Sequence, residues 1–243
     1  MGSEMCIRDR GDGDRRTAKV TDGALNGTSG GRNRQDTATL AGETRFMTTI
    51  ALIRHAATEW NEGGRVQSTT DVPLSDGGRE TVRSWKAPSR LNEFQWVSSP
   101  LSRAVETANI LAGAPPHRTD HRLVEMDWAV WEGMTIAELR TEIGHPGEAW
   151  RAGGLDFKAP GGESQRDVQT RLLSFYREVA EAQQPTVVVC HRGVVRATYS
   201  LAAEWDQKTP WPDTLDDNCV HLFRLQPHGH PEIEELNVPL TID

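Results

Sequence analysis

The sequence has few cysteines, no long apolar run and no excess of basic residues. The three cysteines, Cys6, Cys190 and Cys219, are too few for a disulfide framework and lack the spacing of a zinc site. The longest apolar runs are far shorter than the roughly 20 residues that span a membrane. The net charge is −8, whereas nucleic-acid binding favours a basic surface. We therefore expect a cytoplasmic protein with reduced thiols that binds neither membrane nor nucleic acid.

The first 46 residues differ in composition from the rest of the chain. They hold 8 of the 22 glycines and no tryptophan. Such a segment buries too little apolar surface to offset the entropy lost on ordering, so we expect residues 1–46 to be disordered. The run from Met5 to Arg10 is what one reading frame of a common sequencing-library transposon end encodes. We therefore expect a non-native extension before Met47 and one domain over residues 47–243.

Short apolar runs and amphipathic segments alternate in the remaining residues. The runs are typical of strands, which are expected at residues 49–54, 95–99, 186–190, 219–225 and 234–237. The amphipathic segments favour helices, three of them capped by Ser75, Thr135 and Ser164, at residues 75–86, 102–112, 135–143, 164–184 and 193–203. Residues 144–162 are expected to be irregular. The alternation predicts an α/β domain with a largely parallel sheet.

Three of the expected strands end in residues that suit an anion. One strand runs into Arg54 and His55. Another runs into His191 and Arg192, and a third is soon followed by Arg103. Ligands of such sheets bind beyond the carboxyl ends of the strands. Imidazole and guanidinium groups gathered at that edge predict an anion site.

His55 has the chemistry of a nucleophile towards phosphorus. A neutral imidazole is competent for this attack, and adjacent cations lower its pKa so that it stays neutral. Arginine forks bind phosphate oxygens in a bidentate way and stabilise the charge of the transferred group. Arg54 and Arg103 are therefore expected to hold a phosphate in line with the ring of His55.

Several blocks of the sequence resemble the signature motifs of the histidine phosphatase superfamily. In chain order they are Arg54-His55-Ala56-Ala57-Thr58-Glu59-Trp60-Asn61, Gly64-Arg65-Val66-Gln67, Pro73-Leu74-Ser75-Asp76-Gly77-Gly78, Ser98-Ser99-Pro100-Leu101-Ser102-Arg103, Leu123-Val124-Glu125, Trp131-Glu132-Gly133, Pro160-Gly161-Gly162-Glu163-Ser164 and Val188-Val189-Cys190-His191-Arg192-Gly193. The blocks keep the family's order from residue 49 to about residue 203. The resemblance implies the phosphoglycerate-mutase-like fold, a three-layer α/β architecture with a mostly parallel twisted sheet and helices on both faces.

The resemblance also implies catalytic roles. His55 would be the nucleophile and would form a phosphohistidine. Arg54, Arg103 and His191 would hold the phosphoryl group. Glu125 would protonate the leaving alcohol and then deprotonate water, which agrees with the need of an ester alkoxide for a proton donor.

The expected substrate contacts come from the first motif and the residues after it. Thr58 and Asn61 would contact the phosphate or position its neighbours, and Gln67 would touch the substrate. Asp127 is the nearest competitor of Glu125 for the acid–base role. The resemblance implies neither a metal nor a dissociable cofactor.

Three positions depart from the family pattern. Ala56 stands where glycine usually follows the nucleophile, which is tolerable only if the backbone there needs no positive φ. Arg192 stands where glycine often follows the second histidine, and it would either add a phosphate contact or point to solvent. Trp128 and Ala129 replace an aromatic–glycine pair. These departures leave the substrate preference open.

The implied function is a phosphomonoester phosphatase of the histidine acid phosphatase type, acting on a small phosphate ester. A mutase is one alternative, although only 66 positions separate Glu125 from His191 and mutases of this family carry a longer insertion. A phosphate-binding adaptor is another, and the presence of all five expected catalytic groups argues against it. Sugar phosphates, phosphoglycerate, a ribazole phosphate and aryl phosphates stay open as substrates, as does the oligomeric state.

Overall fold

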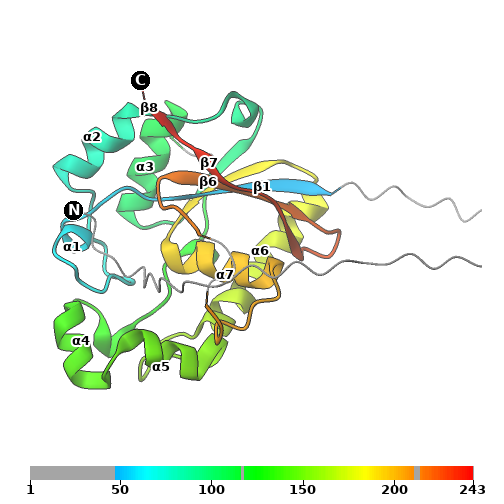
Figure 1. The fold of residues 1–243 in the computed structure, drawn as a ribbon. Coiled ribbons are helices and arrows are strands. Elements are labelled where there is room, and N and C mark those ends of the chain that lie inside the picture. The colour runs from blue at the N-terminus through cyan, green and yellow to red at the C-terminus, as the bar shows by residue number, and fades with distance from the viewer. Residues whose placement is uncertain (1–46, 116–117, 211–213, 243) are drawn as a thin grey trace, which may run out of the picture. The chain divides into compact units, whose positions relative to one another are not determined.

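Strands and helices alternate along the chain in the computed structural model, which describes residues 47–115, 118–210 and 214–242 (Figure 1). The strands are β1 (Thr48–Arg54), β2 (Trp85–Lys86), β3 (Gln95–Ser98), β4 (Arg118–Thr119), β5 (Thr186–Cys190), β6 (Cys219–Leu225), β7 (Pro231–Pro239) and β8 (Thr241–Ile242). The helices are α1 (Glu59–Glu62), α2 (Asp76–Ser84), α3 (Ser102–Ala112), α4 (Ile136–Ile143), α5 (Pro146–Gly153), α6 (Gln165–Ala182) and α7 (Arg192–Ala202). The expectations for residues 1–46 lie outside the described residues.

The main sheet has six strands in the order β4-β3-β5-β1-β6-β7. The strands β4, β3, β5 and β1 run parallel, and β6 and β7 join them antiparallel at one side. Arg54 pairs with Cys190 in the register of β1 and β5, so these two strands end at the same level. The expected α/β fold with a mostly parallel sheet is confirmed. Within the described residues, no helix has the length and apolar character needed to cross a membrane.

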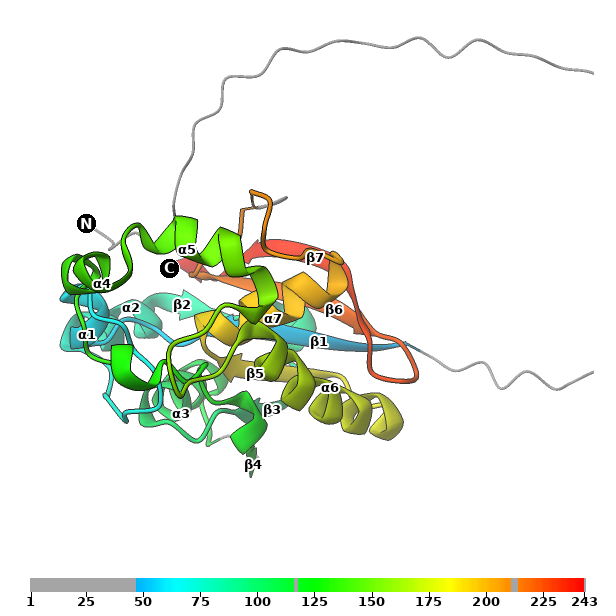
Figure 2. The same cartoon turned by 90° about the horizontal axis from the view of Figure 1, so that it is seen from below.

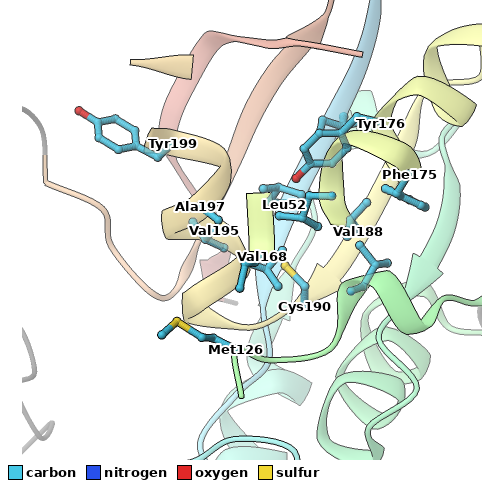
Figure 3. Packing of buried hydrophobic residues seen from close by; sticks show 14 of the residues in the cluster. Leu52, Met126, Val168, Phe175, Tyr176, Val188, Cys190, Val195, Ala197 and Tyr199 are labelled. Carbon is cyan, nitrogen blue, oxygen red and sulfur yellow. The ribbon is translucent and has the colours of Figure 1, made fainter. Parts of the chain in front are cut away.

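Apolar side chains cover both faces of the sheet, because consecutive strand residues point to opposite sides. Ile50 and Leu52 of β1 belong to a buried cluster with α6 and α7, part of which Figure 3 shows. Ala51 and Ile53 belong to a second cluster with α2 and α3. Figures 1 and 2 show these two helix pairs on opposite sides of the sheet. The central strands are therefore buried on both faces, as expected for a three-layer architecture.

Several helices begin where their capping residues predict. The Ser75 side chain accepts a hydrogen bond from the backbone of Gly78 at the start of α2. Thr135 and Ser164 form capping boxes at the starts of α4 and α6. Helix α3 has the bounds expected from sequence and ends at Gly113, whose φ of +66° suits glycine.

Two expectations about secondary structure were wrong. The helix after Ser75 ends at Ser84, because Trp85 and Lys86 extend into β2 and pair with β8. Residues 144–162 are not irregular throughout, since α5 occupies Pro146–Gly153. Pro146 is at the first turn of this helix, where the missing N–H of proline costs nothing.

Candidate active site

The two histidines of the predicted site lie at the ends of adjacent parallel strands. His55 follows β1, and its backbone N–H donates to the Cys190 carbonyl of β5 at 3.0 Å. His191 follows β5, and its ring centroid lies 5.1 Å from that of His55. Ser99 follows β3, and its backbone N–H donates to the Val189 carbonyl at 2.9 Å. The strand order β3-β5-β1 thus brings three chain segments to one edge of the sheet.

Both imidazole rings are oriented by hydrogen bonds. His55 Nδ1 lies 2.6 Å from the Ala56 carbonyl oxygen, which can only accept, so Nδ1 carries the proton. The lone pair of the neutral ring is therefore on Nε2. His191 Nε2 lies 2.8 Å from Ser99 Oγ, and neither ring is more than 5% exposed.

The surroundings keep both rings uncharged. Burial lowers the pKa of His55 well below its ordinary value, and Arg54 and Arg103 lower that pKa further. The pKa of His191 is also lowered well below the ordinary value, by burial and then by His55, Arg103 and Arg54. Both rings are therefore neutral near pH 7, the state in which an imidazole can act as a nucleophile.

Arg103 is a fully buried cation in the first turn of α3. Its Nη1 donates to the Thr70 carbonyl at 2.9 Å and its Nη2 donates to the Ser68 carbonyl at 2.7 Å. The backbone N–H groups of Ser68 and Thr70 in turn donate to Glu132 Oε1 at 3.1 and 2.8 Å. A carboxylate distant in sequence thus holds the loop that orients this guanidinium.

Arg54 lies at the end of β1, and its Nη1 contacts Asp217 Oδ2 at 2.7 Å. Among the described residues, Arg54 Nε, Arg103 Nε and His191 Nδ1 are buried nitrogens without a hydrogen-bond partner. Buried polar groups are almost always hydrogen-bonded, and an unpaired one costs about 1–3 kcal/mol. A tetrahedral oxyanion has enough acceptor oxygens to pair with all three.

Glu125 is placed by two backbone donors, one of them at the start of α7. Its Oε1 accepts from the Met126 N–H at 2.7 Å and from the Gly193 N–H at 3.0 Å, and its Oε2 lies 3.2 Å from the same Gly193 nitrogen. A Cβ on Gly193 would lie 2.2 Å from Glu125 Oε1, so only glycine permits this approach. Glu125 Oε2 has fewer donors than Oε1, which leaves it the better placed oxygen for exchanging a proton.

The residues expected to contact substrate form two groups. Thr58 Oγ1 donates to Asn61 Oδ1 at 3.0 Å and accepts from Gln67 Nε2 at 3.1 Å. This cluster caps α1, and its direct contact with substrate stays a prediction. Arg192 forms an ion pair with Asp217, through Nη2 to Oδ2 and through Nε to Oδ1 at 3.1 Å. Asp127, the alternative to Glu125, accepts from the backbone N–H of Ala129 at 2.8 Å.

The departures from the family pattern differ in their structural effect. Ala56 is not among the described residues with positive φ, and its N–H donates to Thr107 Oγ1 at 3.2 Å. Ala129 has a φ of +40°, in the left-handed region that favours glycine. The methyl group is therefore accommodated at residue 56 and strained at residue 129.

Sequence reasoning assigned no separate role to Ser99, Glu132 or Asp217. Ser99 carries a usable signal, because it ends an expected strand beside proline. Glu132 lies in the Trp131-Glu132-Gly133 block, but its backbone partners are remote in sequence, so the block did not reveal its contact. Asp217 carries no sequence signal, because its partners Arg54 and Arg192 are remote in sequence. Among the described residues, no group of three or more His, Cys, Asp or Glu side chains is arranged to hold a metal ion.

Comparisons with known proteins agree with this geometry. Residues 50–239 match the model of the histidine phosphatase superfamily, branch 1. The chain therefore belongs to the histidine phosphatase superfamily, which confirms the resemblance in the sequence motifs.

Individual relatives cover most of the domain. Phosphoserine phosphatase 1 of Hydrogenobacter thermophilus is 30% identical over 185 residues, which are 74% of this chain and 88% of that protein. Phosphoglycerate mutase-like protein 4 of Arabidopsis thaliana is 30% identical over 186 residues, 72% of this chain and 79% of that protein. The crystal structure of phosphoserine phosphatase from Entamoeba histolytica in complex with 3-phosphoglyceric acid is similar, with a TM-score of 0.66 and 26% identity, and covers 79% of this chain and 97% of that chain.

Proposed function

We propose that the chain is a phosphomonoester phosphatase that works through a phosphohistidine on His55 and needs no metal. The observation that carries this proposal is the neutral His55 ring, with its lone pair on Nε2, among Arg54, Arg103 and His191. The cations supply the charge that a transferring phosphoryl group requires. Glu125, held at the start of α7, supplies the proton exchange.

In the first step, His55 Nε2 attacks the phosphorus atom and forms a P–N bond. The bond between phosphorus and the ester oxygen breaks, and protonated Glu125 gives its proton to the departing alkoxide. Such proton transfer typically contributes about 10²–10⁴ in rate. The guanidinium groups of Arg54 and Arg103 and the His191 Nδ1–H stabilise the phosphoryl oxygens.

In the second step, water attacks the phosphorus atom of the phosphohistidine. The Glu125 carboxylate accepts a proton from this water, and the P–N bond breaks. Inorganic phosphate leaves, and both His55 and Glu125 return to their starting protonation states. One carboxyl group therefore serves as acid and then as base.

A trapped intermediate tests this mechanism directly. The protein is incubated with p-nitrophenyl phosphate in the presence of EDTA and quenched in alkali, because phosphohistidine is labile in acid. Mass spectrometry should find one phosphoryl group on the peptide that contains His55. If the second step is too fast, Glu125→Gln should accumulate the adduct.

His55→Ala removes the proposed nucleophile, and His145→Ala is the control because His145 is exposed, directly precedes α5 and makes no capping hydrogen bond with its side chain. We expect His55→Ala to lower kcat/KM by at least about a thousandfold with its circular dichroism retained. The control should keep its activity. An active His55→Ala protein would place the nucleophile elsewhere.

For the substrate, we propose small phosphate esters that carry a carboxylate. Both phosphoserine and 3-phosphoglyceric acid, named for the related proteins, have a carboxylate near the ester. Arg192 supports this proposal, because its guanidinium is partly exposed and forms an ion pair with Asp217, the carboxylate that also pairs with Arg54. Phosphoserine should have a higher kcat/KM than phosphoethanolamine, which lacks only the carboxylate. Arg192→Gly should reduce that preference.

A phosphoglycerate mutase is a second candidate because one of the similar proteins is named phosphoglycerate mutase-like protein 4. The two functions differ in where the phosphoryl group goes. With 3-phosphoglycerate and a bisphosphoglycerate primer, phosphorus NMR would show a 2-phosphoglycerate signal for a mutase and inorganic phosphate for a phosphatase. We expect inorganic phosphate.

We also propose that the enzyme is of the histidine acid phosphatase type and that it is cytoplasmic. A His55 pKa well below its ordinary value keeps the nucleophile neutral in mildly acidic solution, which supports activity there. The free thiols of Cys190 and Cys219 suit a reducing compartment. A pH–rate profile and cell fractionation are the respective measurements.

A further inference from the structure

One carboxylate outside the family motifs joins two of the site's cations. Asp217 precedes β6, and its Oδ2 accepts from Arg54 Nη1 at 2.7 Å and from Arg192 Nη2. Its Oδ1 accepts from Arg192 Nε at 3.1 Å. Arg54 ends β1 and Arg192 begins α7, so Asp217 links the end of one element to the start of the other.

The charge of this carboxylate offsets repulsion among the cations. Burial acts to raise the pKa of Asp217, but the charge of Arg54 and the hydrogen bonds of Arg192 outweigh it and hold that pKa below its ordinary value. Burial lowers the pKa of Arg54, and Asp217 opposes this shift whereas Arg192 adds to it. An ionised Asp217 therefore offsets the repulsion between two neighbouring guanidinium groups and holds them close together.

The segment that carries Asp217 is fixed by the antiparallel side of the sheet. Asn237 Oδ1 accepts from the Asp216 N–H at 2.8 Å, and Asn237 Nδ2 donates to the Thr214 carbonyl at 2.6 Å. His221 Nε2 lies 3.1 Å from the Asp216 carbonyl oxygen, and His221 Nδ1 accepts from the Asn237 N–H at 3.3 Å. Asn237 has a φ of +56° in β7, where the register with β6 shifts. Hydrogen bonds from β6 and β7 thus fix the backbone next to Asp217.

We propose that Asp217 is a positioning residue that holds the Arg54 guanidinium in place for the phosphoryl group and Arg192 beside it. Asp217 contacts Nη1 of Arg54, whereas Arg54 Nε is buried without a partner. The Arg54 guanidinium is therefore held through Nη1, and its other N–H groups are left to donate to an oxyanion. This role rests on the proposed function, because it assigns the phosphate to Arg54.

Binding of inorganic phosphate tests this role without turnover. Calorimetric titration is carried out in the His55→Ala background, so that a failure of the phosphohistidine mechanism does not affect the result. We expect Asp217→Asn to weaken phosphate binding by at least about tenfold, the loss that goes with one charge-assisted hydrogen bond. Asp217→Glu, which keeps the charge, should recover part of the affinity.

The matched control is Asp216→Asn, which removes the same charge one residue away. The hydrogen bonds of Asp216 described above use its backbone and not its side chain. We expect this control to bind phosphate as the His55→Ala parent does, and all variants to keep the parent's melting temperature within a few degrees. Unchanged binding in Asp217→Asn, or equal weakening in Asp216→Asn, would overturn the proposal. Tighter binding in Asp217→Asn would show instead that Asp217 competes with phosphate for Arg54.

A second readout uses the enzyme with an active His55. If Asp217 only positions the binding cation, Asp217→Asn should raise KM for p-nitrophenyl phosphate much more than it lowers kcat. A loss confined to kcat would contradict this and indicate a part in the chemical step.

Discussion

At the scale of single residues, the site depends on close approaches that only particular side chains allow. Gly193 is the clearest case, because its N–H donates to Glu125 at 3.0 Å and a Cβ there would lie 2.2 Å from Glu125 Oε1. The Glu125 carboxylate and the start of α7 can therefore be in contact only through glycine.

Gly193→Ala should move the Glu125 carboxylate and lower kcat by about 10²-fold or more, since it disturbs the proton-transfer group. Gly77→Ala is the control, because a Cβ on that helical glycine meets its nearest atom at an ordinary 3.6 Å. Steady-state kinetics on p-nitrophenyl phosphate compares the two. Equal activity would show that Glu125 tolerates displacement or does not take part.

Ala129 illustrates a residue whose backbone is strained. An L-residue in the left-handed region costs about 1–2 kcal/mol, and glycine in turn loses about 0.5–1 kcal/mol in entropy. Ala129→Gly should therefore raise the free energy of unfolding by up to about 1.5 kcal/mol, measured with urea. Gly133→Ala, at a φ of +79°, is the reverse substitution and should lower it. A destabilised Ala129→Gly would refute the strain argument.

At the scale of elements, the parts of the site that were predictable are those at strand ends. His55 and His191 follow runs of apolar residues, and parallel strands must bring their carboxyl ends to one edge. Arg103 was predictable because it lies in the first turn of a helix that starts shortly after a strand. The loops that tie these residues together were not, because no local pattern specifies that Glu132 meets the backbone of Ser68 and Thr70.

This loop provides a test of positioning by an element. Glu132→Gln removes the negative charge that accepts from the backbone N–H groups of Ser68 and Thr70. The carbonyl groups of the same two residues, which accept from Arg103, should then be held less firmly. We expect KM for phosphate esters to rise about three- to tenfold, in line with a weakened hydrogen bond to a charged group. Glu142→Gln, in the exposed part of α4, should leave KM unchanged. A fall in kcat alone would argue against this role.

At the scale of the whole molecule, stability should depend on pH through buried histidines. Burial lowers the pKa of His55, His191 and His221 below the ordinary value, whereas the unfolded chain protonates near pH 6.5. Below that pH the unfolded state binds more protons, so acid favours unfolding. The stabilisation is complete above about pH 6.5 and is lost as pH falls, by up to about 1.4 kcal/mol per pH unit for each histidine.

Urea unfolding at pH 7.5, 6.5 and 5.5 measures this slope. His55→Gln should reduce it by the share of one histidine, whereas substitution of exposed His145 should not change it. A free energy of unfolding that does not fall between pH 6.5 and 5.5 would mean that these rings accept protons in the folded state.

A last prediction at this scale concerns the N-terminal boundary of the domain. The elements and site contacts described above all lie within residues 48–242. We expect a protein that begins at Met47 to keep the kcat/KM and melting temperature of the full chain. A large loss of either would show that the domain includes residues before Met47.

The two histidines lie at the ends of β5 and β1, the third and fourth strands of a six-stranded sheet. The amides of His55 and Ser99 donate to carbonyl groups of β5, so their hydrogens reach solvent only when the central strands separate. These amides should exchange with deuterium as slowly as global unfolding allows. Loss of activity in denaturant should then coincide with loss of the sheet, which makes a colorimetric phosphatase assay a direct reading of the folded fraction.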